Sequence, residues 1–460
     1  MAVQRRDVLL GAFGSLAGFA AGGPTAWAVE NVKAAPAGRD DDRTFVTPED
    51  FGAKGDGNTP DQDALGAAAA YLDARGGGTI RLLQKVYACS AEWKLPCGVN
   101  LVGPGTLKFT TPDSNGIYCS TNRTRKGQHS VIEDVQFGRS GSNGGKAIYT
   151  QSDNSALYTQ SQHWFVRRCA FLDLDAPYTL PPSGGEPSRY GWECCFDLSH
   201  SNGSSFTDND VYGAFDPKKA VDGQLESVGV RLGTNNTNGV IATAIAMNRL
   251  WYLHTALFIG EDVLAFWFQN NECIKCFRGV YAPADANGDG TVLQADTRII
   301  DNNITTCTVG IDLTNRQLFR IRGNNCNSDP AYFDNGLGFT GVRLTNCLKY
   351  SIENLSVNLA KGHSAWRGDK YGIHLVHSGS GQVSMVQISR YVDDAIRIEA
   401  SSYLQFDWLQ FTQISKAGFS FKGPCKNVQI GNVQYVNSEP AAKFRFDDGE
   451  TTMQNLTVEQ

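Results

Sequence analysis

A short repeated strand pattern is the feature that most constrains this chain. From about Trp192 onward, Gly or Ala is followed by an apolar residue, a variable residue and a second apolar residue, as in Gly341–Leu344, Gly372–Leu375 and Ala395–Ile398. The last three repeats start 23 residues apart (395 − 372 and 418 − 395). Self-similarity at this period predicts a solenoid, in which each unit buries its apolar side chains only against its neighbours.

The alternation within each repeat indicates the type of solenoid. Apolar residues recur at every second position, which is the period of a strand, so we predict an all-β parallel β-helix. Stacked strands place the residue between the two apolar ones on one outward face, ~4.8 Å from its counterpart in the next coil. The predicted outward row consists of Asp197, Arg231, Phe258, Tyr281, Asp312, Arg343, His374, Arg397, Ser420 and Arg445.

The amino terminus carries a targeting pattern. Arg5–Leu10 resembles a twin-arginine signal, an apolar stretch follows, and Ala26–Ala28 has the small-x-small form of a cleavage site. We therefore predict a signal peptide over residues 1–28, a linker over 29–43 and one β-helix domain over 44–460. The pattern predicts export of the folded protein to the periplasm or beyond.

The composition and charge of the chain argue against some classes of binding partner. The formal net charge is −6, and no basic block is present, which argues against nucleic acid as a partner. No apolar run after the signal is long enough to span a bilayer. Because the chain would fold in a reducing cytosol before export, most of its 12 cysteines are predicted to be buried thiols in the core. Turn asparagines, Asn248, Asn271, Asn303 and Asn325, are predicted to form side-chain ladders between coils.

The first part of the mature chain carries a family resemblance. Asp50–Asp61 is a glycine-rich loop, a helix is predicted over Asp63–Arg75, and Gly76–Ile80 leads into strands that end at Val99–Gly105. This stretch resembles the opening of the pectate-lyase-like superfamily, which includes polygalacturonase-type enzymes and phage tailspike depolymerases. The resemblance implies a single-stranded right-handed parallel β-helix whose amino end is capped by the loop and a short helix.

One acidic loop has the spacing of a calcium site. Oxygen donors fall at the positions of an EF-hand-type loop, with Gly290 where the chain must turn sharply. Asp at the twelfth position, in place of Glu, resembles dockerin loops. The alternative is an acidic turn without a metal. The candidate ligands of a structural calcium ion are Asp285, Asn287, Asp289, Thr291 and Asp296.

The outward row contains the residues of a candidate catalytic and sugar-binding site. Three consecutive coils present Arg343, His374 and Arg397, and like charges at this spacing repel one another unless an anion compensates them. Neighbouring carboxylates such as Glu399 can supply that anion internally, which would make the row a salt-bridged face. The preceding loop adds aromatic and polar groups of the kind that hold sugar rings, namely Trp366, Asp369, Lys370 and Tyr371. Gly341, Gly372 and Ala395 are expected to leave the strand surface open to a polymer chain.

Two enzyme chemistries fit this row. In a lyase that acts on an acidic, uronate-containing polysaccharide by β-elimination, Arg343 and Arg397 would hold the uronate. His374 would be the base or would relay the proton to the leaving group. In a glycoside hydrolase, Asp369 and Asp394 would be the acid and the base. The strand Val392–Ile398 resembles the paired-aspartate strand of polygalacturonases. Their Gly-His-Gly strand, one coil later, reads Ala417-Gly418-Phe419 here.

Further alternatives stay open. A second candidate site lies around the longest insertion, with Trp192, Glu193, Asp197, His200, Asp216, Lys218 and Lys219. A non-catalytic carbohydrate-binding or surface structural β-helix is the rival function from another class. The polymer, its linkage and the oligomeric state are not specified by the sequence, with a homotrimer as one alternative.

Overall fold

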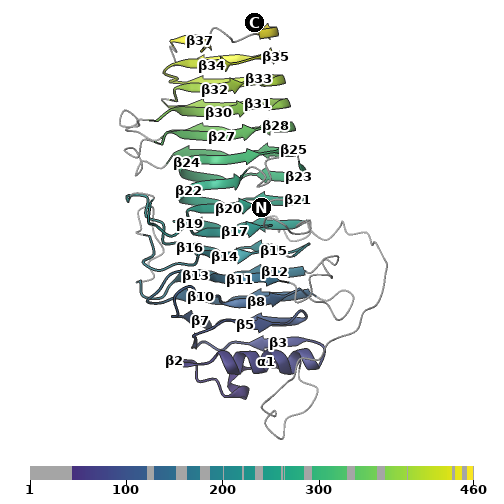
Figure 1. Ribbon diagram of the computed structural model, residues 1–460, viewed down its shortest axis with the longest axis vertical. Helices are drawn as coiled ribbons and strands as arrows, with labels where there is room; N and C mark the ends of the chain where they lie inside the picture. Colours follow the sequence, from purple (N-terminus) through teal and green to yellow (C-terminus); the bar gives the residue numbers. More distant parts are fainter. Residues whose placement is uncertain are drawn as a thin grey trace, which may run out of the picture. The chain divides into compact units, whose positions relative to one another are not determined.

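The computed structural model describes residues 44–121, 129–151, 163–176, 187–199, 201–219, 222–233, 242–260, 263, 265–283, 293–328, 337–359, 368–390, 392–437, 441–447 and 453–458. The predicted signal peptide (1–28) and linker (29–43) lie outside these residues. The described residues of the β-helix domain form a right-handed parallel β-helix, as predicted. Successive coils are stacked one above another in Figure 1, from α1 at one end to β37 at the other.

Each coil contributes to three parallel sheets, which we call A, B and C. Sheet A contains β1 (Phe45–Val46), β3 (Gly78–Arg81), β6 (Val99–Val102), β9 (His129–Glu133), β12 (His163–Arg167), β15 (Ser205–Thr207), β18 (Thr243–Ala246), β21 (Ala265–Gln269), β23 (Leu293–Ile300), β25 (Arg316–Arg322), β28 (Leu348–Glu353), the first parts of β31 (Gly379–Ser389) and β33 (Ser402–Thr412), β35 (Cys425–Ile430) and β38 (Met453–Val458). Sheet B contains β2 (Asp56–Pro60), β4 (Val86–Cys89), β7 (Thr106–Phe109), β10 (Gln136–Arg139), β13 (Ala170–Asp173), β16 (Asp210–Tyr212), β19 (Arg249–Trp251), the first parts of β22 (Glu272–Ala282) and β24 (Asn303–Thr314), β26 (Asn325–Ser328), β29 (Ser356–Asn358), the second parts of β31 and β33, and β36 (Val433–Val436). Sheet C contains β5 (Trp93–Leu95), β8 (Ile117–Ser120), β11 (Lys146–Gln151), β14 (Cys194–Asp197), β17 (Val228–Leu232), β20 (Thr255–Ile259), the second parts of β22 and β24, β27 (Phe339–Thr345), β30 (Lys370–Val376), β32 (Asp394–Glu399), β34 (Ala417–Lys422) and β37 (Ala442–Phe446).

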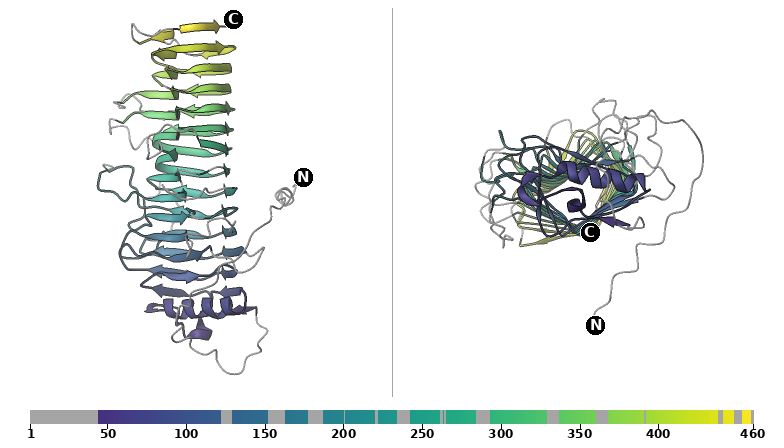
Figure 2. Two further views of the ribbon diagram at one scale, coloured as in Figure 1. Left: turned by 45° about the vertical axis from the view of Figure 1, so that its right-hand side comes forward. Right: turned by 90° about the horizontal axis from the view of Figure 1, so that it is seen from below.

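The amino end of the solenoid is capped as the resemblance implies. A 3-10 helix, η1 (Pro48–Phe51), and the helix α1 (Gln62–Ala74) lie across the first coil, and the end-on view of Figure 2 shows α1 spanning it. The helix buries one apolar side, which includes Leu65, Ala68 and Leu72. Its N-cap, Asp61, accepts hydrogen bonds from the backbone N–H groups of Lys54 and Gly55, at 2.7 and 3.1 Å. The acidic motif of the sequence therefore ties the glycine-rich loop to the cap.

The interior is one continuous apolar core. Residues on either side of the outward row, such as Ile373 and Leu375, are fully buried and pack against their counterparts in adjacent coils. All 12 cysteines lie in the described part of the chain, where each is a buried thiol, so this prediction is confirmed. Among the described residues, no helix is long and apolar enough to cross a membrane.

The corner between sheets A and B explains how the coils stay in register. One residue at this corner has positive φ, as at Met247, Asn270 and Asp301, and its side chain points to solvent. The next residue then turns inward, and five consecutive coils have asparagine there: Asn209, Asn248, Asn271, Asn302 and Asn324.

This asparagine ladder is hydrogen-bonded from coil to coil. The side-chain amide of Asn271 donates to Asn302 Oδ1 at 3.0 Å, and its own Oδ1 accepts from the side-chain amide of Asn248 at 2.9 Å. The sequence prediction was correct for Asn248 and Asn271. Asn303 and Asn325 also bond from coil to coil, since the Asn325 side-chain amide donates to Asn303 Oδ1 at 3.4 Å, but they come after the inward residue and form a separate, outward-facing ladder.

Candidate functional site

The outward row of sheet C is aligned as predicted, but the prediction that it faces solvent is wrong for four of its residues, which are buried: Asp197, Asp312, Arg397 and Ser420. Strand register pairs Asp312 with Arg343, Arg343 with His374, and His374 with Arg397. The complete row, in order along the solenoid, is Lys94, Tyr118, Tyr149, Asp197, Arg231, Phe258, Tyr281, Asp312, Arg343, His374, Arg397, Ser420 and Arg445. We call these residues the outward row.

Sheet C is also the sheet next to which the long connections of the chain begin or end. The segments 174–193, 213–227 and 359–369 each lead into one of its strands, and 283–292 leaves from one. Long connections on a rigid scaffold are where binding surfaces are usually built. The outward row and the points at which these connections join the strands therefore both belong to sheet C.

The arginines of the carboxyl-terminal half of the row are compensated internally. Arg343 donates from Nε to Asp312 Oδ1 at 2.9 Å and also pairs with Asp312 Oδ2. Arg397 donates from Nε to Glu399 Oε1 at 3.0 Å and pairs with Asp447 as well. The salt-bridged arrangement that the sequence left open is thus present. Arg343 nevertheless keeps 43% of its side chain exposed, so its remaining N–H groups can reach a ligand.

His374 is the titratable base of the row. Its Nε2 lies 3.2 Å from Glu399 Oε1, and its ring centre lies 5.0 Å from that of Tyr371. Burial lowers the pKa of His374 below the ordinary value, and this effect exceeds the opposing influence of Glu399. The imidazole is therefore neutral at neutral pH. With Nε2–H directed at the carboxylate, the lone pair lies on Nδ1.

Asp394 occupies a buried position in the neighbouring coil. It is 0% exposed, and its Oδ2 accepts hydrogen bonds from Ser420 at 2.8 Å and Arg445 at 2.7 Å. Burial raises the pKa of Asp394 despite these two donors. Its Oδ1 is buried and has no hydrogen-bond partner. Asp394 is consequently close to the row but closed to solvent.

The other predicted contributors differ in accessibility. Asp369 is exposed and accepts a hydrogen bond from the Tyr371 hydroxyl at 3.1 Å. Burial, together with Asp369, raises the pKa of Tyr371, so the phenol keeps its proton. Lys370 is buried, and its Nζ lies 3.2 Å from Asp393, so its charge is directed into the protein. Trp366 lies outside the described residues.

The expectation that small residues open the strand surface is wrong. A Cβ added to Gly341 would lie 2.7 Å from Val357 side-chain atoms, and one added to Gly372 would lie 2.6 Å from Ile388. Both neighbours belong to the core. These glycines therefore make room for core side chains, and the position two residues later in each strand faces the solvent.

The proposed calcium loop falls almost entirely outside the described residues, which include none of Asp285, Asn287, Asp289 and Thr291. Asp296 lies within β23, where strand register pairs it with Ala265 of the preceding coil. Among the residues that the structure describes, no group of three or more His, Cys, Asp or Glu side chains could hold a metal ion.

The second candidate site is divided between the core and the surface. Trp192 is buried and packs edge-on against Phe109 at 5.2 Å, so it belongs to the interior. Asp197, in the outward row, is buried and pairs with Lys146 at 2.7 Å. Asp216 forms an ion pair with Lys219 at 3.1 Å and accepts a hydrogen bond from the backbone N–H of Lys218. Glu193 is exposed, and His200 lies outside the described residues.

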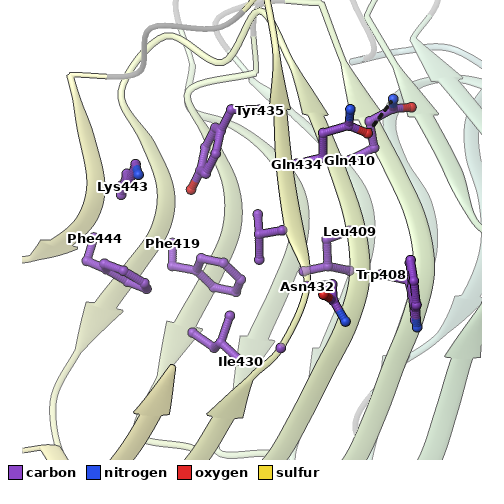
Figure 3. A pocket seen from close by; sticks show the side chains of 12 residues that line it. Trp408, Leu409, Gln410, Phe419, Ile430, Asn432, Gln434, Tyr435, Lys443 and Phe444 are labelled. Atoms are coloured by element: carbon purple, nitrogen blue, oxygen red, sulfur yellow. Dashed lines mark hydrogen bonds between the residues drawn. The ribbon is translucent and has the colours of Figure 1, made fainter. Parts of the chain in front are cut away.

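A cavity of about 920 Å³ lies at the carboxyl-terminal end of the described coils. Figure 3 shows Phe419, Ile430 and Phe444 lining it, with Tyr435 and Lys443 above them. Phe419 and Ile430 are core residues, and Phe444 packs against that core. The cavity is thus the open end of the core and does not include His374 or Arg343.

Two partners in the row's charge network were missed by the sequence analysis. Asp447 forms ion pairs with both Arg397 and Arg445. The guanidinium of Arg278 lies over the ring of Tyr281, 4.3 Å from the ring centre. Asp447 follows Arg445 by two residues on the same face. Arg278 precedes Tyr281 by three residues and comes directly after an irregularity in β22. An alternation-only pattern does not find residues beyond such an irregularity.

Comparison with known proteins supports the fold. No family model matches the chain, and no match was found among curated proteins. Among solved structures, the tailspike protein of E. coli bacteriophage HK620, in complex with a pentasaccharide, is similar with a TM-score of 0.56 at 11% identity, over 90% of this chain and 79% of that one. Bacteriophage CBA120 tailspike protein 3 gives 0.47 at 11% identity, over 90% of this chain and 61% of that one.

A third solved structure is an enzyme. DFA-IIIase from Arthrobacter chlorophenolicus A6 gives a TM-score of 0.45 at 10% identity, over 90% of this chain and 95% of that one. At these identities the likeness concerns the fold alone, and it agrees with the three parallel sheets described above. The chain has the right-handed parallel β-helix fold that its resemblance to the pectate-lyase-like superfamily implies.

Proposed function

We propose that this protein is an exported polysaccharide lyase that cleaves an acidic, uronate-containing polymer by β-elimination on the face of sheet C. The observation that carries the proposal is His374, a neutral imidazole held by Glu399 beside the half-exposed Arg343. The pentasaccharide bound by a tailspike of the same fold is consistent with a glycan as the ligand.

The residues can perform the elimination in a balanced way. Arg343 pairs with the uronate carboxylate, which makes the proton on C5 more acidic. His374 Nδ1 accepts that proton, and Glu399 stabilises the imidazolium that forms. The C5–H electron pair becomes the C4–C5 double bond as the C4–O bond breaks. The leaving oxygen takes a proton from the imidazolium or from the Tyr371 hydroxyl, which Asp369 orients.

A glycan panel tests the reaction class. We expect purified protein to generate the ultraviolet absorbance of an unsaturated uronate from at least one acidic polysaccharide. New reducing ends without that absorbance would indicate hydrolysis instead. If no acidic or neutral glycan is cut, the non-catalytic binding function is the one to retain.

The pH dependence of turnover follows from His374. A base must be unprotonated, so kcat is expected to fall as the pH drops through the pKa of His374. Burial lowers that pKa below the ordinary histidine value of about 6.5, so activity is expected to persist at pH 6.5 and to decline only below it. A pH–rate profile measures this, and an acidic limb centred above pH 6.5 would contradict the assignment.

Calcium is proposed as a structural ion in the Asp285 loop. If the ion binds there, chelation is expected to lower the melting temperature, and Asp289→Ala is expected to remove that sensitivity while the fold is kept. Thermal melting with calcium and with chelator checks this. Equal melting temperatures of the unmodified protein under both conditions would rule the site out.

A further inference from the structure

The arginines on sheet C differ in whether a carboxylate compensates them. Arg343, Arg397 and Arg445 are each ion-paired. In the described part of the chain, no carboxylate pairs with Arg231 of β17 or Arg278 of β22. The carboxylates at either end of this stretch of the row are already occupied, because Asp197 pairs with Lys146 and Asp312 with Arg343.

Both uncompensated arginines lie over aromatic rings. The guanidinium of Arg231 is 4.9 Å from the ring centre of Phe258, and that of Arg278 is 4.3 Å from that of Tyr281. The two rings meet edge to face, with centres 6.0 Å apart. All four side chains are partly exposed, so each has both a packing contact and a surface for a ligand.

Two arginines beside two aromatic rings provide the chemical groups that a site for an acidic sugar needs. Aromatic rings pack against the apolar C–H surface of a sugar, and planar guanidinium groups bind carboxylates with paired hydrogen bonds. Between Asp197 and Asp312, whose carboxylates are already paired, Arg231 and Arg278 are the charged members of the described sheet C strands, and both are cations. The stretch is therefore positive on a protein whose net charge is −6.

We propose that Arg231, Phe258, Arg278 and Tyr281 form a distal subsite that binds an acidic unit of the same polymer that is cleaved at His374. The proposal rests on the proposed function for the identity of the polymer. The subsite and His374 lie on one face and in one row, so a single extended chain can follow the solenoid axis and contact both.

The spacing sets a minimum polymer length. From Phe258 the row passes through Tyr281, Asp312 and Arg343 to His374, which is four coil steps of ~4.8 Å, or about 19 Å in total. One coil step is comparable to the length of one pyranose unit. Tyr281, the nearest row member of the distal subsite, lies three of these steps, about 14 Å, from His374. A trimer centred on His374 extends about one unit to either side and does not reach it, whereas an octamer can occupy both.

Oligomer binding tests the subsite. Dissociation constants are measured by calorimetry for trimers and octamers of oligogalacturonate and oligomannuronate, with His374→Ala as the background so that the ligand is not cut. Replacing both Arg231 and Arg278 by Gln is expected to weaken octamer binding by about a hundredfold, since each charge-assisted contact contributes about tenfold. Trimer binding is expected to stay unchanged.

Two controls separate recognition from folding. Arg249→Gln changes an exposed arginine of sheet B that pairs with Asp210, and it should leave octamer binding unaltered. Replacing Arg231 and Arg278 by Lys keeps both charges but not the paired hydrogen bonds, so it is expected to recover part of the octamer affinity. A role of the two arginines in packing alone would give no such charge-dependent recovery.

The outcomes are distinguishable from failure of the proposed function. Equal octamer affinity with and without the two arginines overturns the distal subsite alone, whereas failure of every acidic octamer to bind overturns the proposed substrate class as well. If the two arginines control octamer binding but the His374→Ala variant still cleaves, the distal subsite stands and the catalytic assignment fails.

Discussion

Replacing His374 by alanine is expected to lower kcat on the acidic polymer by about a thousandfold, since a positioned general base contributes about 10² to 10⁴ in rate. His374 is the one histidine of the outward row, and its imidazole is neutral at neutral pH because burial lowers its pKa. Substrate affinity should change little, because Arg343 and the aromatic residues remain. Steady-state kinetics separates kcat from KM.

A matched control lies three residues away. His377 is exposed at the corner that follows β30 and has positive φ, a conformation that Asn tolerates. The His377→Asn variant is therefore expected to cut at the unaltered rate.

Loss of activity in Asp394→Asn alone, with melting unchanged, would favour hydrolysis by carboxylates. If the His374 and Asp394 variants both cut at the wild-type rate, the outward row is only a salt-bridged face. The candidate site would then be the one around Glu193 and Asp216.

The largest expected effect on stability comes from the asparagine ladder. Asn271 donates to Ile245 O and Asn302 Oδ1, and its Oδ1 accepts from the backbone and side-chain amides of Asn248. Asn271→Ala removes this partner from Ile245 O and from both amides of Asn248 in the preceding coil, whereas Asn302 Oδ1 still accepts the backbone N–H of residue 271. The free energy of unfolding is expected to fall by about 3 to 5 kcal/mol. Denaturant unfolding measures the change.

Asn303 provides the control for this prediction. It is exposed, and its side chain only accepts a 3.4 Å hydrogen bond from Asn325. Asn303→Ala should change the unfolding midpoint little. Similar destabilisation by the two substitutions would mean that the ladder contributes no more than an exposed pair.

Most of the fold could be predicted from local patterns. The alternation around residues such as Arg343 and His374 fixes which side chains face the core, and a repeat of constant length fixes the register between coils. Local patterns did not determine which asparagine at each corner turns inward. Whether Asn302 or Asn303 turns inward depends on which residue adopts positive φ at the corner, and Asp301 and Asn302 are both compatible with that conformation.

The site was less predictable, for physical reasons. The row itself follows from alternation, but which arginine is compensated depends on side chains from other coils. Asp447 reaches Arg397 across 50 positions in the sequence. Arg278 comes directly after the irregularity in β22 between Cys276 and Arg278, where alternation no longer predicts which side chains face outward. Gly341 and Gly372 look like gaps on a binding surface, yet their missing side chains belong to the interior.

The buried thiols have a consequence for life outside the cytoplasm. Burial raises the pKa of Cys169, Cys194, Cys326 and Cys347 to about 12, so almost no thiolate exists at neutral pH. Oxidation and disulfide exchange both proceed through the thiolate and require access to it. A chain exported as we propose would therefore be redox-inert while folded. It could reside in an oxidising compartment with every cysteine reduced, without help from an oxidoreductase or isomerase.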